Sequence, residues 1–291
     1  VNVSVSYSRC STFVLPMALV FAASTRDWDE VLRLLDLGRE KINQTDRSSG
    51  MTCLMWTCQW GNYKIAQKLL ETVGIDAICE PLSFKDEVIN GRNRHGVTPL
   101  MFAADGNAPD IVKLLLQNLA NAETLSLHGM SALLLASRSG AAKTVEVLLE
   151  GNANINVKGA GGLTALMHAA GEDQTDVVEV LLQHGPAMDL QDRDGLTALI
   201  YATRKNATIR PRHNFAPMVD YIKKCSHVPS VMDMLLEAQA DLELRDKEGK
   251  RALDHAGAKS YHLLQRYQNE LEWKRYEKME EERAQTAQTA G

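Results

Sequence analysis

Apolar and polar positions follow a helical rhythm that recurs along the chain. In its middle part, residues 98–104, 131–137, 164–170 and 197–203 each begin with Thr or Ser, which is followed mainly by apolar and small residues. After a fixed gap comes a second stripe with spacing i, i+3, i+4, which is typical of the buried face of a short helix. The pattern predicts consecutive helix pairs, none of which can bury its apolar faces alone.

The period of this pattern is regular over four units and then varies. The regular copies start at Thr98, Ser131, Thr164 and Thr197, a period of 33 residues. Weaker copies start at Met17, Thr52 and Arg251, with longer spacings. The extra length predicts two insertions, near 74–91 and 207–227. The first is expected to enlarge a turn between units, and the second to lie between the two helices of one unit.

These residues resemble the ankyrin repeat family over about residues 17–265. The stretches HGVTPLMFAA, GGLTALMHAAGEDQTDVVEVLLQHG and DRDGLTALIYA carry the resemblance. It implies an all-α solenoid of about seven helix-pair units, including degenerate terminal caps, with β-hairpin-like fingers. The family's usual His, three residues after the Thr, is replaced by apolar residues, so we expect an apolar layer there. The replacements are Met55, Met101, Leu134, Met167 and Ile200.

The resemblance divides the chain into three regions. Residues 1–16 are interpreted as a disordered N-terminal extension, and 17–268 as the repeat domain with units starting near 17, 52, 98, 131, 164, 197 and 251. Residues 269–291 are interpreted as a charged helix and tail, because a sustained heptad of a coiled coil is missing. Gly140, Asn107 and Asn206 are expected in the turns between paired helices, since Gly and Asn tolerate left-handed backbone.

The N-terminal apolar run, 13–23, has two interpretations. It follows Arg9 and ends in small residues, as a secretory signal peptide does, and it is too short to span a bilayer. Alternatively, Met17–Leu37 is the capping helix pair of the repeat array. The second interpretation is favoured because Ala22, Ala23 and the stripe beginning at Val31 fall on the repeat register, which a secretion signal has no reason to obey.

Composition places the chain among globular proteins. Hydrophobic residues make up 45% and charged residues 24%, and the net charge is −5, which excludes a generally basic nucleic-acid binder. The five cysteines are too few and too irregular for a disulfide scaffold, so we expect free thiols in a reducing compartment, the cytoplasm and also the nucleus. Cys53 and Cys58 occupy core positions of the repeat.

Motifs that carry chemistry are missing from the sequence. It contains no Walker loop, zincin helix or nucleophile elbow. The glycine-rich stretch 158–162 falls on a finger, where Gly162 matches the family's turn glycine, so a phosphate-binding role is rejected. The histidines lack the spacing of metal ligands. We therefore predict a non-catalytic protein without cofactor, metal or small-molecule substrate.

The resemblance also implies that partners bind the concave side, formed by fingertips and first helices. At the corresponding positions bases outnumber acids by eleven to five, so a partner with an acidic surface is expected, and the chain would act as adaptor, scaffold or regulatory subunit. The candidate partner-binding residues are Trp56, Trp60, Arg92, Arg94, His95, Phe102, Met130, Arg138, Arg193, Tyr201, Arg204 and Lys205.

One row of residues has two interpretations. Four residues after each anchor Thr or Ser the chain has Trp56, Phe102, Leu135, His168 and Tyr201. These side chains either fill the seams between neighbouring units or form part of the partner site. Trp60 lies one turn further on and has small or polar counterparts in the other units, so we expect it to be exposed and to act as a binding hot spot.

Two alternative functions remain open at this point. The repeats could regulate an enzyme or signalling region of a longer chain. The second insertion and its flanks, 204–229, carry six Lys and Arg but only Asp220 as an acid, so an anionic surface, a membrane or a nucleic acid, is a weaker candidate partner.

Overall fold

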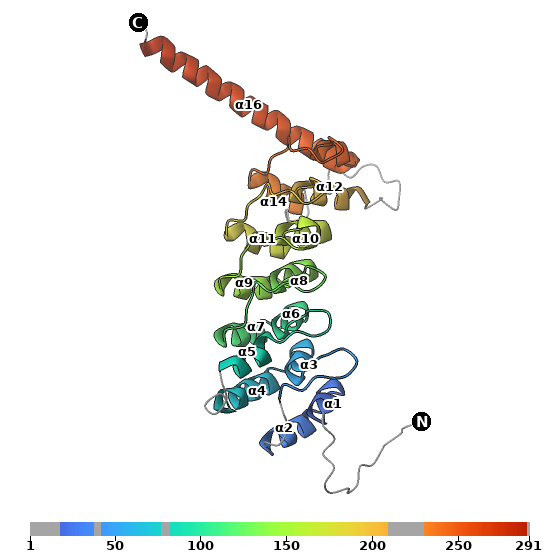
Figure 1. Ribbon diagram of the computed structural model, residues 1–291. Helices are drawn as coiled ribbons and strands as arrows, with labels where there is room; N and C mark the ends of the chain where they lie inside the picture. Colours follow the sequence, from blue (N-terminus) through green and yellow to red (C-terminus); the bar gives the residue numbers. More distant parts are fainter. Residues whose placement is uncertain (1–17, 38–41, 77–81, 209–229, 290–291) are drawn as a thin grey trace, which may run out of the picture. The chain divides into compact units, whose positions relative to one another are not determined.

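The computed structural model describes residues 18–37, 42–76, 82–208 and 230–289. The N-terminal extension, most of the second insertion and Cys10, Cys79 and Cys225 lie outside these ranges. The chain forms two compact units, Val1–His128 and Gly129–Gly291. Figure 1 shows each of them as a stack of short helix pairs.

Unit 1 contains the pair predicted within Met17–Leu37 and the two that follow it. First helices pack on first helices, and second helices on second helices. The first helices are α1 (Ala18–Ser24), α3 (Cys53–Gln59) and α6 (Pro99–Asp105), and the second helices are α2 (Trp28–Asp36), α4 (Tyr63–Asp76) and α7 (Pro109–Gln117). A further helix, α5 (Leu82–Asn90), packs against α4 and α6.

Unit 2 repeats the same arrangement and ends in a long helix. Its first helices are α8 (Ala132–Ser139), α10 (Ala165–Glu172), α12 (Ala198–Thr208) and α15 (Ala252–His255), and its second helices are α9 (Ala142–Glu150), α11 (Thr175–Gln183) and α14 (Val231–Glu237). A 3₁₀ turn, η1 (Ala160–Gly162), precedes α10, and α16 (Ala258–Thr289) follows α15. Both units confirm the predicted all-α repeat architecture.

The anchor Thr or Ser of each regular unit caps its first helix. The Thr98 hydroxyl accepts from the Met101 backbone N–H at 3.3 Å, and the Ser131 hydroxyl from Leu134 N–H at 3.2 Å. Pro99 occupies the first turn of α6, where the missing N–H costs nothing. Such caps satisfy donors that the helix itself leaves unpaired. The local sequence thus sets where each first helix begins.

A left-handed residue nine positions after the anchor turns the chain into the second helix. Gly140 has φ 78° and Asn107 has φ 49° at this place, which confirms the predicted turns. Asn206 was predicted to form the same turn, and this prediction is wrong because α12 continues to Thr208. The insertion that follows α12 removes the need to reverse direction at Asn206.

The core is aliphatic and follows the predicted stripes. The expected apolar layer is confirmed, since Met55, Met101, Leu134, Met167 and Ile200 are all at most 1% exposed. Paired small residues such as Ala103 and Ala104 are fully buried between helices. In the described part of the chain no helix is long and apolar enough to cross a membrane.

The fingers are tight turns rather than extended ribbons. Asn93 and Asp246 each accept two backbone N–H groups of their own turn through Oδ1, all at 2.9 Å. Neighbouring fingers are joined by single backbone bonds, such as Leu127 N–H to His95 C=O in unit 1. Within the described ranges the structure contains no strand, and one isolated bridge joins Thr45 to Thr52.

The first insertion was expected to enlarge a finger. Its described part instead forms α5, in which Val88 and Ile89 are buried. The 33-residue period has no counterpart for this segment, so the repeat pattern alone gave no reason to expect a helix there. Asn90 Oδ1 accepts the Asn121 backbone N–H at 2.8 Å and ties the end of α5 to the next finger.

Candidate protein-binding surface

The aromatic row of unit 1 lies on the first helices. Trp56 and Phe102 are half-buried, which agrees with side chains that partly fill the seams between neighbouring units. Phe21 occupies the equivalent position of the first unit, four residues after Met17, and is 68% exposed. The aromatic row of unit 1 is therefore more exposed at Phe21, on α1, than at Trp56 and Phe102.

Trp60 contacts both an aromatic ring and a cation. Its ring lies 6.3 Å from that of Trp56, with 16° between the planes. The Arg26 guanidinium carbon lies 3.5 Å from the Trp60 ring centroid, a cation–π contact. Trp60 remains 38% exposed, so the prediction of an exposed Trp holds for part of the side chain. The rest of the side chain contacts Trp56 and Arg26. We call Arg26, Trp56 and Trp60 the Trp60 stack.

Two features of the Trp60 stack leave donors unused. No hydrogen bond or ion pair joins the Arg26 guanidinium to any described residue, and a stacked guanidinium still presents its N–H groups in its own plane. The Trp56 indole N–H is buried and also has no partner among the described residues. Donors of this kind normally find an acceptor, since an unpaired buried N–H costs free energy.

The candidate finger residues of unit 1 also make contacts that hold neighbouring fingers together. Arg92 donates to the Leu125 carbonyl and Arg94 to the Arg47 carbonyl. Both arginines are exposed and keep their charge, but part of their hydrogen-bonding capacity joins neighbouring fingers. His95 is exposed and stacks on His128, with ring centroids 6.1 Å apart.

Tyr201 of unit 2 holds its own finger. Its hydroxyl donates to Asp192 Oδ2 at 2.7 Å, and burial together with this carboxylate raises the Tyr201 pKa. His255 lies at the same repeat position and contacts Asp246 Oδ2 through Nε2 at 2.7 Å. His168, the third polar member of the row, is half-buried, and burial followed by the Arg138 charge lowers its pKa. The polar residues of this row therefore mainly make contacts within unit 2.

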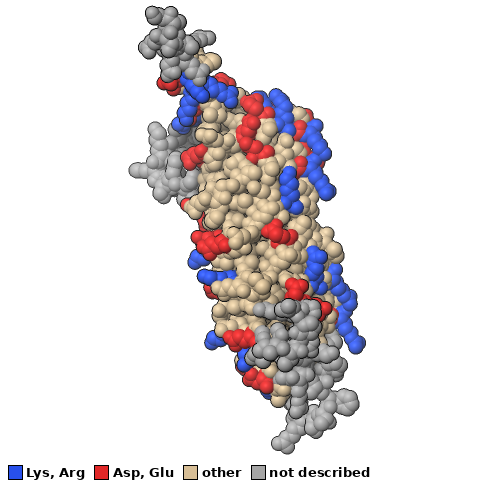
Figure 2. Space-filling view, turned by 60° about the vertical axis from the view of Figure 1, so that its left-hand side comes forward, with Lys and Arg blue, Asp and Glu red and all other residues tan. Residues whose placement is uncertain are grey.

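The basic candidate residues of unit 2 differ in whether they form ion pairs and in how exposed they are. Lys205 pairs with Glu172 at 3.1 Å. Arg138, Arg193 and Arg204 are exposed, whereas Met130 is half-buried beside the α8 cap. In the upper half of Figure 2, which shows unit 2, acidic side chains stand directly beside basic ones. Unit 2 therefore presents mixed charge rather than an uninterrupted basic surface.

The remaining chemical candidates are structural. Cys53 and Cys58 are fully buried free thiols, and burial raises the Cys53 pKa to about 12, so their predicted core role is confirmed. Gly159 lies where a Cβ would come 2.5 Å from the Gly129 carbonyl, which explains the glycine-rich stretch as close finger packing. No cluster of three or more His, Cys, Asp and Glu suited to a metal occurs in the described residues.

Two exposed residues of the first unit were missed by sequence reasoning. Phe21 was detectable, because it sits on the row register counted from Met17. The sequence did not single out Arg26, because its candidacy as a binding residue depends on its contact with the Trp60 ring, which sequence position alone does not show. Arg26 also occupies the left-handed turn position, with φ 61°, which disfavours a residue with a Cβ.

Asp46 provides a stability prediction for unit 1. Its carboxylate accepts the Ser48, Ser49 and Met51 backbone N–H groups, at 2.8, 2.6 and 3.1 Å, and both serine hydroxyls. Burial acts to raise the Asp46 pKa, but these hydrogen bonds outweigh it and hold the pKa well below its usual range. We expect Asp46→Ala to lower the free energy of unfolding by about 2 kcal/mol at pH 7.

The pH dependence of this effect has a definite sign. Because the folded-state pKa is depressed, the stabilisation is present above the unfolded-state pKa, about 4, and is lost as the pH falls through and below that value. The difference between wild type and Asp46→Ala, measured by urea denaturation, should therefore shrink between pH 7 and pH 3. An equal difference at both pH values would contradict this account.

Comparisons with known proteins agree with the repeat pattern. The model "Ankyrin repeats (3 copies)" matches residues 77–159 and 157–211, and the model "Ankyrin repeat" matches 49–80. The crystal structure of the human ASB11 ankyrin repeat domain is similar, with 25% identity and a TM-score of 0.66, over 86% of this chain and 97% of that one. A comparison with curated proteins gives no match.

Proposed function

The chain belongs to the ankyrin repeat family, and on that basis we propose that it is a non-catalytic adaptor, scaffold or regulatory subunit that binds an acidic protein surface. Repeats of this family are in general protein–protein interaction modules. The proposed binding elements are the fingertips and the exposed ends of the first helices. The free state of Cys53 and Cys58 supports a proposed location in the cytoplasm, and also the nucleus.

The Trp60 stack carries this proposal. Trp and Arg are among the residue types enriched in binding hot spots, because both give a large contact area with directional donors. Arg26 offers in-plane N–H groups that match a carboxylate in a bidentate manner. Phe21 on the neighbouring helix adds an exposed apolar ring. An acidic side chain flanked by an apolar one fits this set of groups.

The backbone of Arg26 supports the same conclusion. At the equivalent turn the other units have Gly61, Asn107, Gly140 and Asp173. A left-handed Arg costs about 1 kcal/mol relative to Gly, and the cation–π contact returns about 0.5–1 kcal/mol at an exposed site. The fold thus gains little from Arg26, which points to a role for the side chain in binding.

Arg26→Gly is the variant that tests the proposed function. We expect it to change the free energy of unfolding by less than about 1 kcal/mol, because the strain relieved and the stacking lost are similar in size. Affinity for the partner should fall roughly tenfold, the loss of one charge-assisted contact. Affinity capture with mass spectrometry identifies the partner, and calorimetry with the purified partner gives the affinity.

Asn107→Gly is the matched control, since it relieves the same backbone conformation in the same unit without touching the Trp60 stack. It should leave the affinity unchanged. Equal affinities of wild type and Arg26→Gly would remove Arg26 from the site. Affinity that is insensitive to salt between 50 and 500 mM would contradict an acidic partner surface, because steering by exposed charges is screened by salt.

A further inference from the structure

Helix α16 packs on the repeats only through its first half. Leu264 is fully buried and Ser260 is 2% exposed. The Tyr267 hydroxyl donates to the Leu236 carbonyl, which fixes this half against α14. From Glu272 to Glu281 every residue is exposed, and Figure 1 shows this half extending away from α12 and α14.

The free half of α16 is held by its own side chains. The Trp273 indole N–H donates to Glu277 at 2.8 Å and the Tyr276 hydroxyl to Glu280 at 3.0 Å, and just before this half the Arg266 guanidinium donates to Glu270 at 3.0 Å. All these pairs have i, i+4 spacing, which places both partners on one side of the helix. They fix the directions of Trp273 and Tyr276 before anything binds.

Large apolar surface is exposed on this part of the helix. Trp273 is 62% exposed, Met279 50% and Tyr276 49%. The Trp273 and Tyr276 rings lie 6.1 Å apart, with 31° between their planes. The chain has four tryptophans, so leaving one uncovered on the exposed half of α16 calls for an explanation. Exposed aromatic patches rimmed by polar groups mark interaction sites.

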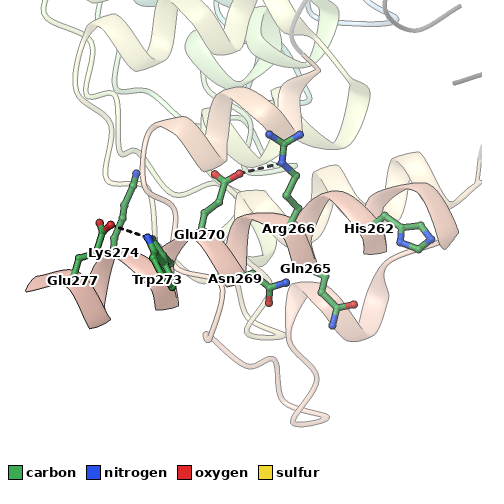
Figure 3. Close-up of a pocket in the computed structure, with 8 residues that line it drawn as sticks. All are labelled: His262, Gln265, Arg266, Asn269, Glu270, Trp273, Lys274 and Glu277. Carbon is green, nitrogen blue, oxygen red and sulfur yellow. Dashed lines mark hydrogen bonds and ion pairs between the residues drawn. The ribbon is translucent and has the colours of Figure 1, made fainter. Parts of the chain in front are cut away.

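Acidic side chains outnumber basic ones around Trp273. At 100° per residue, Glu270, Glu277 and Glu280 fall within about 60° of Trp273. Arg266 falls on the same side and pairs with Glu270, whereas Lys274 and Arg275 fall about 100° or more away. An open depression of about 650 Å³ runs along this part of the helix surface, and its lining residues, among them His262, Asn269, Trp273 and Lys274, all belong to α16. Figure 3 shows Trp273 between Glu277 and Glu270, with Lys274 close by and Arg266 further along the helix. We call Glu270, Trp273, Tyr276, Glu277 and Glu280 the Trp273 face.

We propose that the Trp273 face docks a basic amphipathic segment of a second protein, whose apolar side chains cover Trp273 and Tyr276 and whose Lys or Arg side chains pair with the three glutamates. Each glutamate uses one hydrogen bond within α16 and keeps further acceptor capacity. A second copy of the chain is a poorer occupant, because pairing two such faces brings acids against acids. This surface lies outside the fingers and first helices and is independent of the partner proposed above.

A defined peptide tests the proposal on the full chain. The probe has three heptads with Leu at the seam positions and Lys at the flanking positions, and it is titrated calorimetrically at low salt. We expect wild type to bind it, and Trp273→Ala to bind it at least tenfold more weakly. The combined change Glu270→Gln, Glu277→Gln and Glu280→Gln should also weaken binding about tenfold and flatten its salt dependence.

The matched control removes the same charge elsewhere. Glu146→Gln, Glu150→Gln and Glu179→Gln alter exposed acids on α9 and α11 and should leave the peptide affinity within twofold. All substituted residues are exposed, so far-UV circular dichroism should show an unchanged fold.

Three outcomes would overturn the proposal. The first is a wild-type chain that does not bind the peptide, and the second is equal weakening by both sets of Gln substitutions, which would indicate attraction by net charge alone. The third is self-association in sedimentation equilibrium that Trp273→Ala abolishes, because it would make a second copy the occupant.

Discussion

Leu134→Ala should lower the free energy of unfolding by about 3 kcal/mol. Leu134 is 0% exposed and belongs to α8, which packs against α9 and α10. Truncating a fully buried Leu loses transfer free energy and leaves a cavity, which together cost about 2–5 kcal/mol. Urea denaturation followed by far-UV circular dichroism measures the change.

Leu135→Ala is the control for this prediction. Leu135 is the next residue of the same helix and is only half-buried, so its truncation should cost about 1 kcal/mol or less. Similar losses from both variants would show that the layer formed by Met55, Met101, Leu134, Met167 and Ile200 does not carry the core of the stack.

Trp60→Ala should weaken partner binding by about 2 kcal/mol, which is roughly thirtyfold. The substitution removes the exposed ring edge and also the surface that holds the Arg26 guanidinium in place. It also loses a stacking and a cation–π contact inside the unit, so the free energy of unfolding should fall by about 1 kcal/mol. Calorimetric titration of the partner and urea denaturation of the free chain separate the two effects.

Tyr63→Ala gives the matched comparison for Trp60→Ala. Tyr63 is 41% exposed and belongs to the same unit, but it lies at the start of α4, a second helix. Its truncation should leave partner affinity unchanged. If Trp60→Ala left affinity unchanged and caused a large fall in melting temperature, Trp60 would belong to the core and the site to the charged fingers.

The local parts of this fold could be predicted because each is specified within a few residues. Thr98 caps a helix through the N–H three positions later, and Gly140 turns the chain because its own backbone permits a left-handed conformation. The buried stripes follow from helical periodicity alone. The sequence therefore determined the repeat architecture, the starts of the regular helices, the buried Cys53 and Cys58 and the aromatic row.

The tertiary structure decided how side chains from different elements meet. Sequence register places Tyr201 and Trp60 on a helix face, but the bond of Tyr201 to Asp192 and the stack of Arg26 on Trp60 depend on distances between elements. Helix α5 interrupts the period, so the repeat pattern gave no indication of it. An apolar stripe determines which side of a helix faces inward. The side chains that it meets on other elements depend on how closely helices and fingers approach one another. That spacing arises only when the repeats are stacked.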